Sequence, residues 1–180
     1  MQMVNQRPIK RLLVVVDMQN DFITGALANP EGQKIVGKVA DYIRNFDGHI
    51  VLTQDTHFEN YSETQEGKRL PVPHCICYTN GWNLVPEIQK ALELRSNVYS
   101  GTKDTFGSVQ LGKFISGMGY DEIYFVGVCT DICVISNAML CKAFAPEARI
   151  VVLKDMCAGV TPESHETALK AMQACQIDIE

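Results

Sequence analysis

The sequence predicts an α/β protein in which a mainly parallel sheet of about six strands carries helices on both faces. Short apolar runs alternate with helix-like segments along the chain, and such alternation is typical of parallel sheets with crossover helices. The strand-like runs are apolar without interruption, as expected of strands covered on both faces. With 180 residues, the chain is expected to form a single domain over residues 1–180.

Six strands are expected, each an apolar run that ends at polar or turn-forming residues. In chain order they are Arg11–Val16, His49–Thr53, Asn97–Ser100, Glu122–Val128, Arg149–Leu153 and Ile177–Ile179. Helices are expected between them, where apolar residues recur at helical spacing or a proline or capping residue opens the segment. They are Pro30–Phe46, Leu84–Leu94, Val109–Met118, Ile132–Phe144 and Glu163–Ala174. Residues 1–10 are expected to be a loose lead-in. Residues 58–81 are expected to be a long irregular loop, of the kind that tends to be functional.

Composition limits the kinds of partner. The formal net charge is −5, without a cluster of lysine or arginine, so neither a nucleic acid nor an anionic membrane is an expected partner. Leu12–Val16, the longest apolar run near the start, is too short to cross a bilayer. The residues before Arg11 lack the apolar centre of a signal peptide. The seven cysteines are therefore expected to be free thiols in a reducing cytoplasm.

Cys133 is the first candidate for chemistry. Gly127 opens a turn at the end of a predicted strand, and Thr130 or Asp131 can cap the following helix, which places Cys133 in its first turn. Unpaired N–H groups and the helix dipole favour a thiolate there. Ligands of open α/β sheets bind at that edge, beyond the carboxyl ends of the strands. The alternative is that Cys133 is a small buried apolar residue.

Two charged residues follow other strands and are expected at the same edge. Asp17 comes directly after the first strand, and Lys103 follows the third. The alternatives are a turn or capping aspartate and a solvated surface lysine. If the three side chains meet, the carboxylate can accept the thiol proton, and the thiolate can attack a carbonyl carbon. The same acid can then protonate a departing amine, and the lysine would hold Asp17 ionised and oriented.

A second set of residues has the composition of a metal site. Asp55 and His57 are two apart in an extended segment, so their side chains project to the same side. His74 follows Pro71 and Pro73, which stiffen the backbone before it. Two histidines and a carboxylate suit zinc, iron or manganese and leave positions open for water or substrate. Each histidine by itself has a structural or solvent-facing alternative.

Together these residues resemble the cysteine hydrolase superfamily that includes isochorismatases and nicotinamidases. The resemblance runs from Leu12 to the C-terminus, and it is carried by Asp17-Met18-Gln19-Asn20-Asp21-Phe22, Asp55-Thr56-His57, His74-Cys75, Lys103 with Phe106, and Gly127 to Cys133. It implies a three-layer α/β/α sandwich with a doubly wound sheet, and a catalytic triad of Asp17, Lys103 and Cys133. It also implies a cis peptide bond between Val128 and Cys129, which would turn the N–H groups of Cys129 and Cys133 toward an oxyanion.

The metal-ligand pattern is that of the nicotinamidase branch, since isochorismatase-type members generally lack it. The resemblance therefore implies one divalent ion, zinc first and iron or manganese as alternatives, held by Asp55, His57 and His74. Glu66 is a candidate fourth ligand. Phe22 and Val128 are candidate walls of the substrate pocket, with a plain core position as the alternative for Phe22.

The implied function is hydrolysis of a small primary carboxamide through a cysteine thioester. Nicotinamide, giving nicotinate and ammonia, is the first candidate, although Pro71 and Tyr78 depart from the usual nicotinamidase pattern. Three alternatives are another small amide or acyl substrate, a non-catalytic binding or regulatory protein on this fold, and redox sensing by the cysteines. Relatives commonly form dimers or tetramers, so a homo-oligomer is expected.

Overall fold

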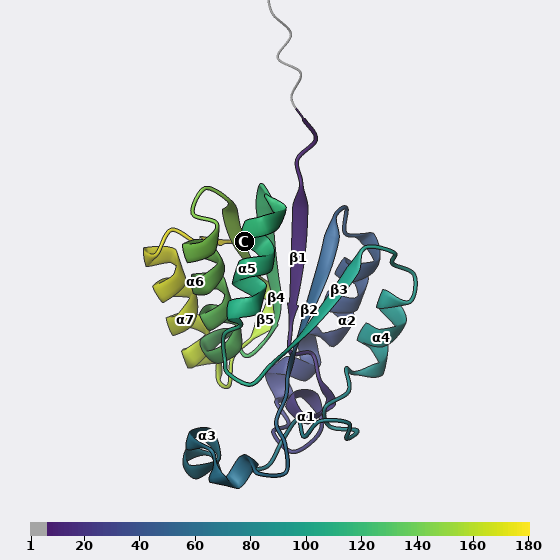
Figure 1. Cartoon of the computed structure of the whole chain (residues 1–180), viewed down its shortest axis with the longest axis vertical. Helices are drawn as coiled ribbons and strands as arrows, with labels where there is room; N and C mark the ends of the chain where they lie inside the picture. The colour runs from purple at the N-terminus through teal and green to yellow at the C-terminus, as the bar shows by residue number, and fades with distance from the viewer. Residues whose placement is uncertain (1–6) are drawn as a thin grey trace, which may run out of the picture.

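The computed structural model describes residues 7–180, so residues 1–6 of the expected lead-in lie outside the described part. Six parallel strands form one sheet in the order β3-β2-β1-β4-β5-β6. They are β1 (Arg11–Val16), β2 (His49–Asp55), β3 (Val98–Lys103), β4 (Glu122–Val128), β5 (Arg149–Ala158) and β6 (Asp178–Ile179). The sheet stands between two layers of helices (Figure 1), which confirms the predicted fold class.

Helices of the two layers come from different parts of the chain. One face carries α2 (Pro30–Asn45) and α4 (Pro86–Leu92), and the other carries α5 (Val109–Met118), α6 (Ile135–Phe144) and α7 (Pro162–Ala174). Successive residues of β1 alternate between the two layers: Leu12 and Val14 pack in one apolar cluster, Leu13 and Val15 in the other. All four are fully or almost fully buried. Burial on both faces explains why this strand is apolar throughout.

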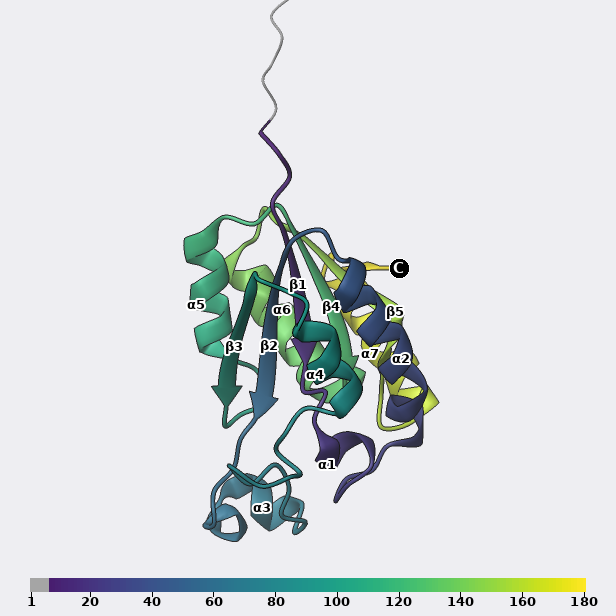
Figure 2. The same ribbon diagram turned by 90° about the vertical axis from the view of Figure 1, so that its right-hand side faces the viewer.

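Three short helical elements lie at the carboxyl end of the sheet and were not predicted. They are α1 (Asn20–Ile23), the 3-10 turn η1 (Tyr61–Glu63) and α3 (Gln65–Arg69). Figure 2 shows α1 and α3 below the tips of the strands. The segment 58–81 is thus not wholly irregular. Its Thr64 side chain accepts a hydrogen bond from Gly67 N and so caps α3. No described helix is long and apolar enough to cross a membrane.

Several strands continue beyond their predicted ends. β2 extends to Asp55 and β3 to Lys103, and these two residues are register partners in the sheet. β5 continues to Ala158, although the apolar run ends at Leu153, because its backbone rejoins β4 after a shift in register. Polar residues interrupt the apolar run after Leu153, so the pattern of apolar residues alone does not predict this continuation.

The strand order creates a crevice between β1 and β4, where the chain changes from one face of the sheet to the other. Ligands of doubly wound folds bind at such a point. Gly127 of β4 has a positive φ of 118°, and a Cβ at this position would lie 2.1 Å from the Val16 carbonyl oxygen. Only glycine therefore permits this approach of β4 to β1, immediately before the residues that carry the site.

Candidate active site

Three side chains predicted from separate strand ends meet at this crevice. Lys103 Nζ lies 2.7 Å from Asp17 Oδ2 and 3.5 Å from Cys133 Sγ. Thr53 Oγ1 donates a hydrogen bond of 2.7 Å to the other Asp17 oxygen. Asp17, Lys103 and Cys133 are all buried, and we call them the thiol cluster.

Asp17 has a free acceptor position within this cluster. Within residues 7–180, its Oδ2 is the only fully buried side-chain oxygen or nitrogen without a well-aligned hydrogen bond. The contact with Lys103 is therefore an ion pair rather than a well-directed hydrogen bond. A buried carboxylate oxygen with an unused lone pair is suited to accept a proton.

Charges and burial decide the protonation of the cluster. Burial raises the pKa of Asp17, and Lys103 offsets this only in part. Burial by itself would lower the pKa of Lys103, but Asp17, Cys133 and Asp55 raise it above its ordinary value. Burial and the Asp17 charge raise the pKa of Cys133 well above its ordinary value. Burial and the Asp17 charge thus oppose the effect expected from the helix start and favour the thiol form of Cys133.

The chain after β4 differs from the predicted α-helical start. A π-helical turn, η2 (Thr130–Val134), precedes α6, and neither Thr130 nor Asp131 caps a helix. Thr130 Oγ1 instead lies 2.8 Å from His165 Nδ1, and Asp131 accepts a hydrogen bond from Val160 N. Both partners are remote in sequence. π-Helical turns are frequent at functional sites, and this one carries Cys133.

The peptide bond between Val128 and Cys129 is cis, as the family resemblance implies. It lies directly before the π-helical turn.

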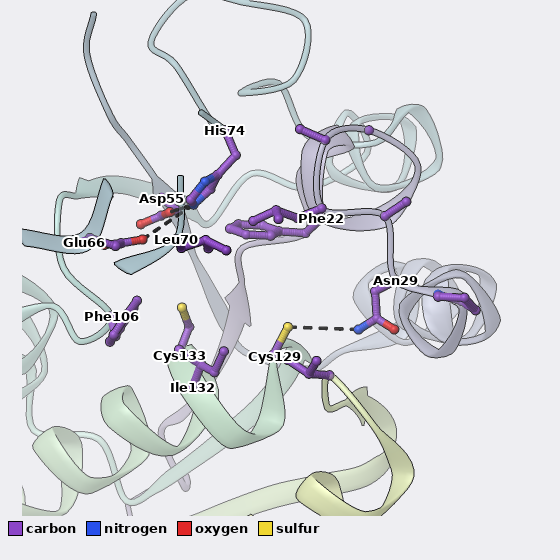
Figure 3. A pocket seen from close by; sticks show the side chains of 16 residues that line it. Phe22, Asn29, Asp55, Glu66, Leu70, His74, Phe106, Cys129, Ile132 and Cys133 are labelled. Carbon is purple, nitrogen blue, oxygen red and sulfur yellow. Dashed lines mark hydrogen bonds and ion pairs between the residues drawn. The ribbon is translucent and has the colours of Figure 1, made fainter. Parts of the chain in front are cut away.

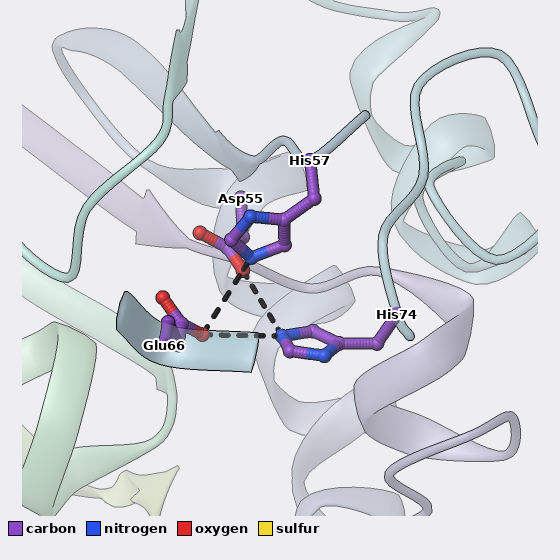
Figure 4. A group of neighbouring side chains, drawn as sticks. All are labelled: Asp55, His57, Glu66 and His74. Atoms are coloured by element: carbon purple, nitrogen blue, oxygen red, sulfur yellow. Dashed lines mark hydrogen bonds and ion pairs between the residues drawn. The ribbon is translucent and has the colours of Figure 1, made fainter. Parts of the chain in front are cut away.

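The predicted metal ligands gather beside the thiol cluster (Figure 4). Asp55 Oδ2 lies 3.0 Å from His57 Nε2 and 3.5 Å from His74 Nε2. Glu66 Oε1, from α3, lies 3.6 Å from each of these nitrogens. One ligand atom from each of the four residues lies within 4.8 Å of all the others. We call these four residues the ligand cluster.

The spacing and chemistry of the ligand cluster fit a divalent metal ion. Tetrahedral ligand atoms at about 2.0–2.1 Å from zinc stand about 3.4 Å apart, close to the separations found here. His74 Nδ1 lies 2.9 Å from the Val72 carbonyl oxygen, so a proton on Nδ1 leaves the Nε2 lone pair facing the cluster. Burial and the Asp55 charge raise the pKa of Glu66, because the two carboxylates face each other.

Asp55 joins the two clusters. Its Oδ2 faces the histidines, and its Oδ1 accepts a hydrogen bond of 3.1 Å from Lys103. Burial alone would raise the pKa of Asp55, but His57, His74 and Lys103 together hold it below its usual range. Asp55 therefore links the two clusters, and these neighbours favour its ionised form.

Cys133 of the thiol cluster and three residues of the ligand cluster, Asp55, Glu66 and His74, line one cavity of about 660 Å³, which Figure 3 shows from close by. Phe22 lines this cavity, with its ring centroid 5.5 Å from that of His74. Val128, predicted as a second wall, does not line it: it is fully buried in the apolar core on the α2 side of the sheet. An uninterrupted apolar strand does not reveal which of its residues reaches a cavity. The lining residues are Phe22, Gly25, Ala26, Leu27, Ala28, Asn29, Pro30, Asp55, Glu66, Leu70, His74, Phe106, Cys129, Ile132, Cys133 and Val160.

Three buried amide side chains support the site and were not singled out from the sequence. Gln19 accepts a hydrogen bond from Asp55 N and donates one to Asp55 O, at 2.7 and 2.9 Å. Asn137 donates to the carbonyls of Cys133 and Phe106. Asn29 donates to Gly159 O. Among these three residues, only Gln19 has a recognisable position in the sequence, because it lies in the polar segment directly after a predicted strand.

The fold and these clusters define a doubly wound α/β protein with a cysteine-centred site beside a group of four side chains that could hold a metal ion. Residues 11–179 match the model of the family described as the Isochorismatase domain, so the chain belongs to the isochorismatase family.

Relatives agree with this assignment over nearly the whole chain. The nicotinamidase/pyrazinamidase of Mycobacterium tuberculosis is 29% identical over 94% of this chain and 97% of its own length. The uncharacterised isochorismatase family protein PncA of Bacillus subtilis is 33% identical, over 89% of this chain and 93% of its own. Among solved structures, the pyrazinamidase of Pyrococcus horikoshii in complex with zinc has a TM-score of 0.80 and 34% identity, covering 95% of this chain and 98% of that one.

Proposed function

We propose that this protein is a metal-containing cysteine amidohydrolase that converts nicotinamide into nicotinate and ammonia. The observation that carries the proposal is that Cys133, whose thiol contacts the amine of a buried acid–amine pair, lines the same cavity as Asp55, Glu66 and His74 of the two-histidine, two-carboxylate cluster. Similarity to nicotinamidases and pyrazinamidases supports the choice of a heteroaromatic carboxamide.

The reaction starts with a proton transfer from Cys133 to Asp17. The raised pKa of Asp17, caused by burial, and its unused Oδ2 acceptor support this role. Lys103 stays charged and stabilises the anion, whether it resides on the carboxylate or on the sulfur.

The Cys133 sulfur then forms a bond to the amide carbon, and the carbonyl electrons move onto oxygen. The N–H groups of Cys129 and Cys133 are proposed to hold that oxyanion. Protonated Asp17 returns its proton to the amide nitrogen, the carbon–nitrogen bond breaks and ammonia leaves a thioester. Water, deprotonated by Asp17, hydrolyses the thioester to nicotinate and restores the thiol.

Asp55, His57 and His74 are proposed to hold one divalent ion, with Glu66 as the fourth ligand. Zinc suits this ligand set best, and iron and manganese are the alternatives. When bound, the ion supplies a Lewis acid that orients the substrate through its ring nitrogen or activates water.

We also propose that the protein works in the cytoplasm as a dimer or tetramer. The seven cysteines are all free, as a reducing compartment requires. Light scattering of the purified protein measures the subunit number, and a monomeric mass would contradict the second part of this proposal.

Replacement of the nucleophile tests the chemistry. Cys133→Ala should lower nicotinamide turnover by at least about 10⁴-fold, since a covalent step cannot proceed without the sulfur. Ammonia release measures turnover, and circular dichroism and metal analysis show whether fold and metal are retained. Cys175→Ala, at an exposed cysteine, is the control and should keep full activity. Substantial turnover by Cys133→Ala would exclude covalent catalysis.

Replacement of a histidine tests the metal assignment. Protein purified without chelator should contain about one ion per chain, and His57→Ala should lose most of it. His49→Ala is the control, because His49 contacts Tyr120 instead of the ligand cluster. Elemental analysis gives the result, and full metal occupancy in His57→Ala would show that the assigned ligands are wrong.

A further inference from the structure

The cavity extends well beyond the two clusters. Figure 3 shows Cys133 and Phe22 near its middle, Asp55, Glu66 and His74 on one side, and Asn29 on the other. Asn29 Nδ2 donates a hydrogen bond of 2.9 Å to Gly159 O, which brings the segment before α2 against the segment after β5. We define the distal end of the cavity by Leu27, Ala28, Asn29, Pro30 and Val160, which all line it.

The cavity is too large for the proposed substrate alone. Nicotinamide has about nine non-hydrogen atoms, and at no more than about 30 Å³ for each, the share of a water molecule in the liquid, it occupies at most about 270 Å³. The cavity measures about 660 Å³, within the range typical of sites for drug-sized ligands. If the ring nitrogen faces the ligand cluster and the amide carbon faces Cys133, the unused volume lies toward the distal end.

The distal end is apolar and offers no cation. The polar atoms of the Asn29 side chain already have partners: its Oδ1 accepts from Glu31 N, and its Nδ2 donates to Gly159 O and contacts the Cys129 sulfur at 4.0 Å. The other four distal residues present carbon atoms from their side chains. No lysine or arginine is among the described residues that line the cavity, whereas Asp55 and Glu66 both line it. An anionic substituent would therefore find no cationic partner there, while an apolar one would cover the carbon atoms of these side chains.

Resting on the proposed function, we infer that the distal end is a second substrate subsite, which takes an uncharged apolar substituent on the aromatic carboxamide. The substrate class then includes ring-substituted amides considerably larger than nicotinamide. Leu27, Ala28 and Val160 are the residues that determine this specificity.

A series of substituted amides tests the subsite in the intact protein. We compare kcat/KM for nicotinamide with that of its butyl derivatives carrying the chain at ring position 4, 5 or 6. Each methylene group that leaves water adds up to about fourfold to binding. At least one isomer should therefore exceed nicotinamide by about fivefold or more. A smaller gain or a loss for every isomer overturns the inference.

A substitution that fills the distal end locates the effect. Val160 is 55% exposed at the cavity wall, so Val160→Trp adds volume without disturbing the core. It should reduce the ratio of kcat/KM for the best butyl isomer to that for nicotinamide by at least about fivefold. Leu94→Trp, at an exposed leucine away from the cavity, should leave that ratio unchanged. An unchanged ratio in Val160→Trp shows that the butyl group does not bind at the distal end.

A charged analogue tests the inferred preference of the distal end for uncharged substituents. The best butyl isomer is compared with an equally long chain that ends in a carboxylate, which should lower kcat/KM by at least about tenfold. Equal rates for the two would contradict the inferred preference for uncharged groups.

The same measurements separate this inference from the proposed function. Turnover of nicotinamide without any gain from substituents overturns only the subsite. Turnover of butyl derivatives without turnover of nicotinamide overturns only the assignment of nicotinamide as substrate. Absence of turnover on every amide overturns both.

Discussion

Asp17 and Asp55 are the two buried carboxylates that contact Lys103, yet their surroundings shift their pKa values in opposite directions. Lys103 Nζ lies 2.7 Å from Asp17 and 3.1 Å from Asp55. Burial raises the pKa of Asp17 more than Lys103 and Thr53 lower it. Burial also acts on Asp55, but His57, His74 and Lys103 together outweigh it.

Since both carboxylates contact the same lysine, the difference lies in their other neighbours, and these decide the role of each buried carboxylate. Asp17 has an oxygen without an aligned donor, and its raised pKa suits a group that takes and returns a proton. Asp55 faces Lys103 with one oxygen and the two histidines with the other, which suits a metal ligand. One lysine thus contacts both the proposed proton acceptor and a proposed metal ligand within a single site.

The largest expected effect is that of removing the proton acceptor. Asp17→Asn should lower kcat/KM for the amide by about 10³–10⁴-fold, because asparagine cannot take the thiol proton. Metal content should stay at the wild-type level, since Asp17 does not belong to the ligand cluster. Ammonia release and elemental analysis check the two parts.

The same variant should make Cys133 easier to ionise. The Asp17 charge raises the pKa of Cys133, so its removal lowers that pKa and leaves Lys103 to stabilise a thiolate. The pH profile for alkylation of Cys133 by iodoacetamide, followed by peptide mass spectrometry, should therefore move to lower pH while turnover is lost. A profile that stays in place or moves upward would contradict the electrostatic coupling of Asp17 and Cys133.

Removing the shared lysine should affect stability. Lys103→Met leaves the buried Asp17 without its cation, and breaking a buried pair in this way costs about 3–5 kcal/mol of unfolding free energy. Urea denaturation at neutral pH measures this loss. Lys34→Met is the control: it breaks the Lys34–Glu31 pair on the surface of α2, and such pairs contribute less than about 1 kcal/mol.

The pH dependence of the unfolding free energy lost in Lys103→Met tests whether Asp17 causes the loss. Loss of Lys103 removes the main interaction that lowers the pKa of Asp17, so the folded-state pKa rises further above that of the unfolded chain. Ionised Asp17 then destabilises the folded variant at neutral pH, and the penalty disappears as the pH falls through the folded-state pKa. The difference between variant and wild type should narrow on acidification, and a constant difference would exclude Asp17 as its source.

The thiol cluster could be predicted from the sequence because its members come from the ends of parallel strands. Asp17 follows β1, Lys103 ends β3 and Cys133 follows β4, and such ends share one edge of the sheet by topology alone. The ligand cluster was predicted from residue types and spacing, although Glu66 remained open because α3, which presents it, was not predicted.

The remaining features depend on contacts between remote segments. The π-helical turn at 130–134 has Thr130 bound to His165 and Asp131 bound to Val160, whereas capping signals in the sequence report only nearby partners. The distal end of the cavity likewise forms where Asn29 meets Gly159. Burial of Val128 in the core instead of the cavity wall follows from packing on α2, which no local pattern records.

The smallest expected effect tests how Asp55 is positioned. Gln19 holds the Asp55 backbone through its N–H and its carbonyl, so Gln19→Leu should let the Asp55 carboxylate move relative to the histidines. We expect metal affinity to fall by about 10–100-fold, the range typical of groups that orient metal ligands. Titration of metal-free protein against a competing chelator measures this change. Gln54→Leu is the matched control, because the Gln54 side chain donates to the same Trp82 carbonyl as Gln19 but makes no hydrogen bond to Asp55. Equal affinity losses in the two variants would assign the effect to the Trp82 segment, and the proposed positioning role of Gln19 would be wrong.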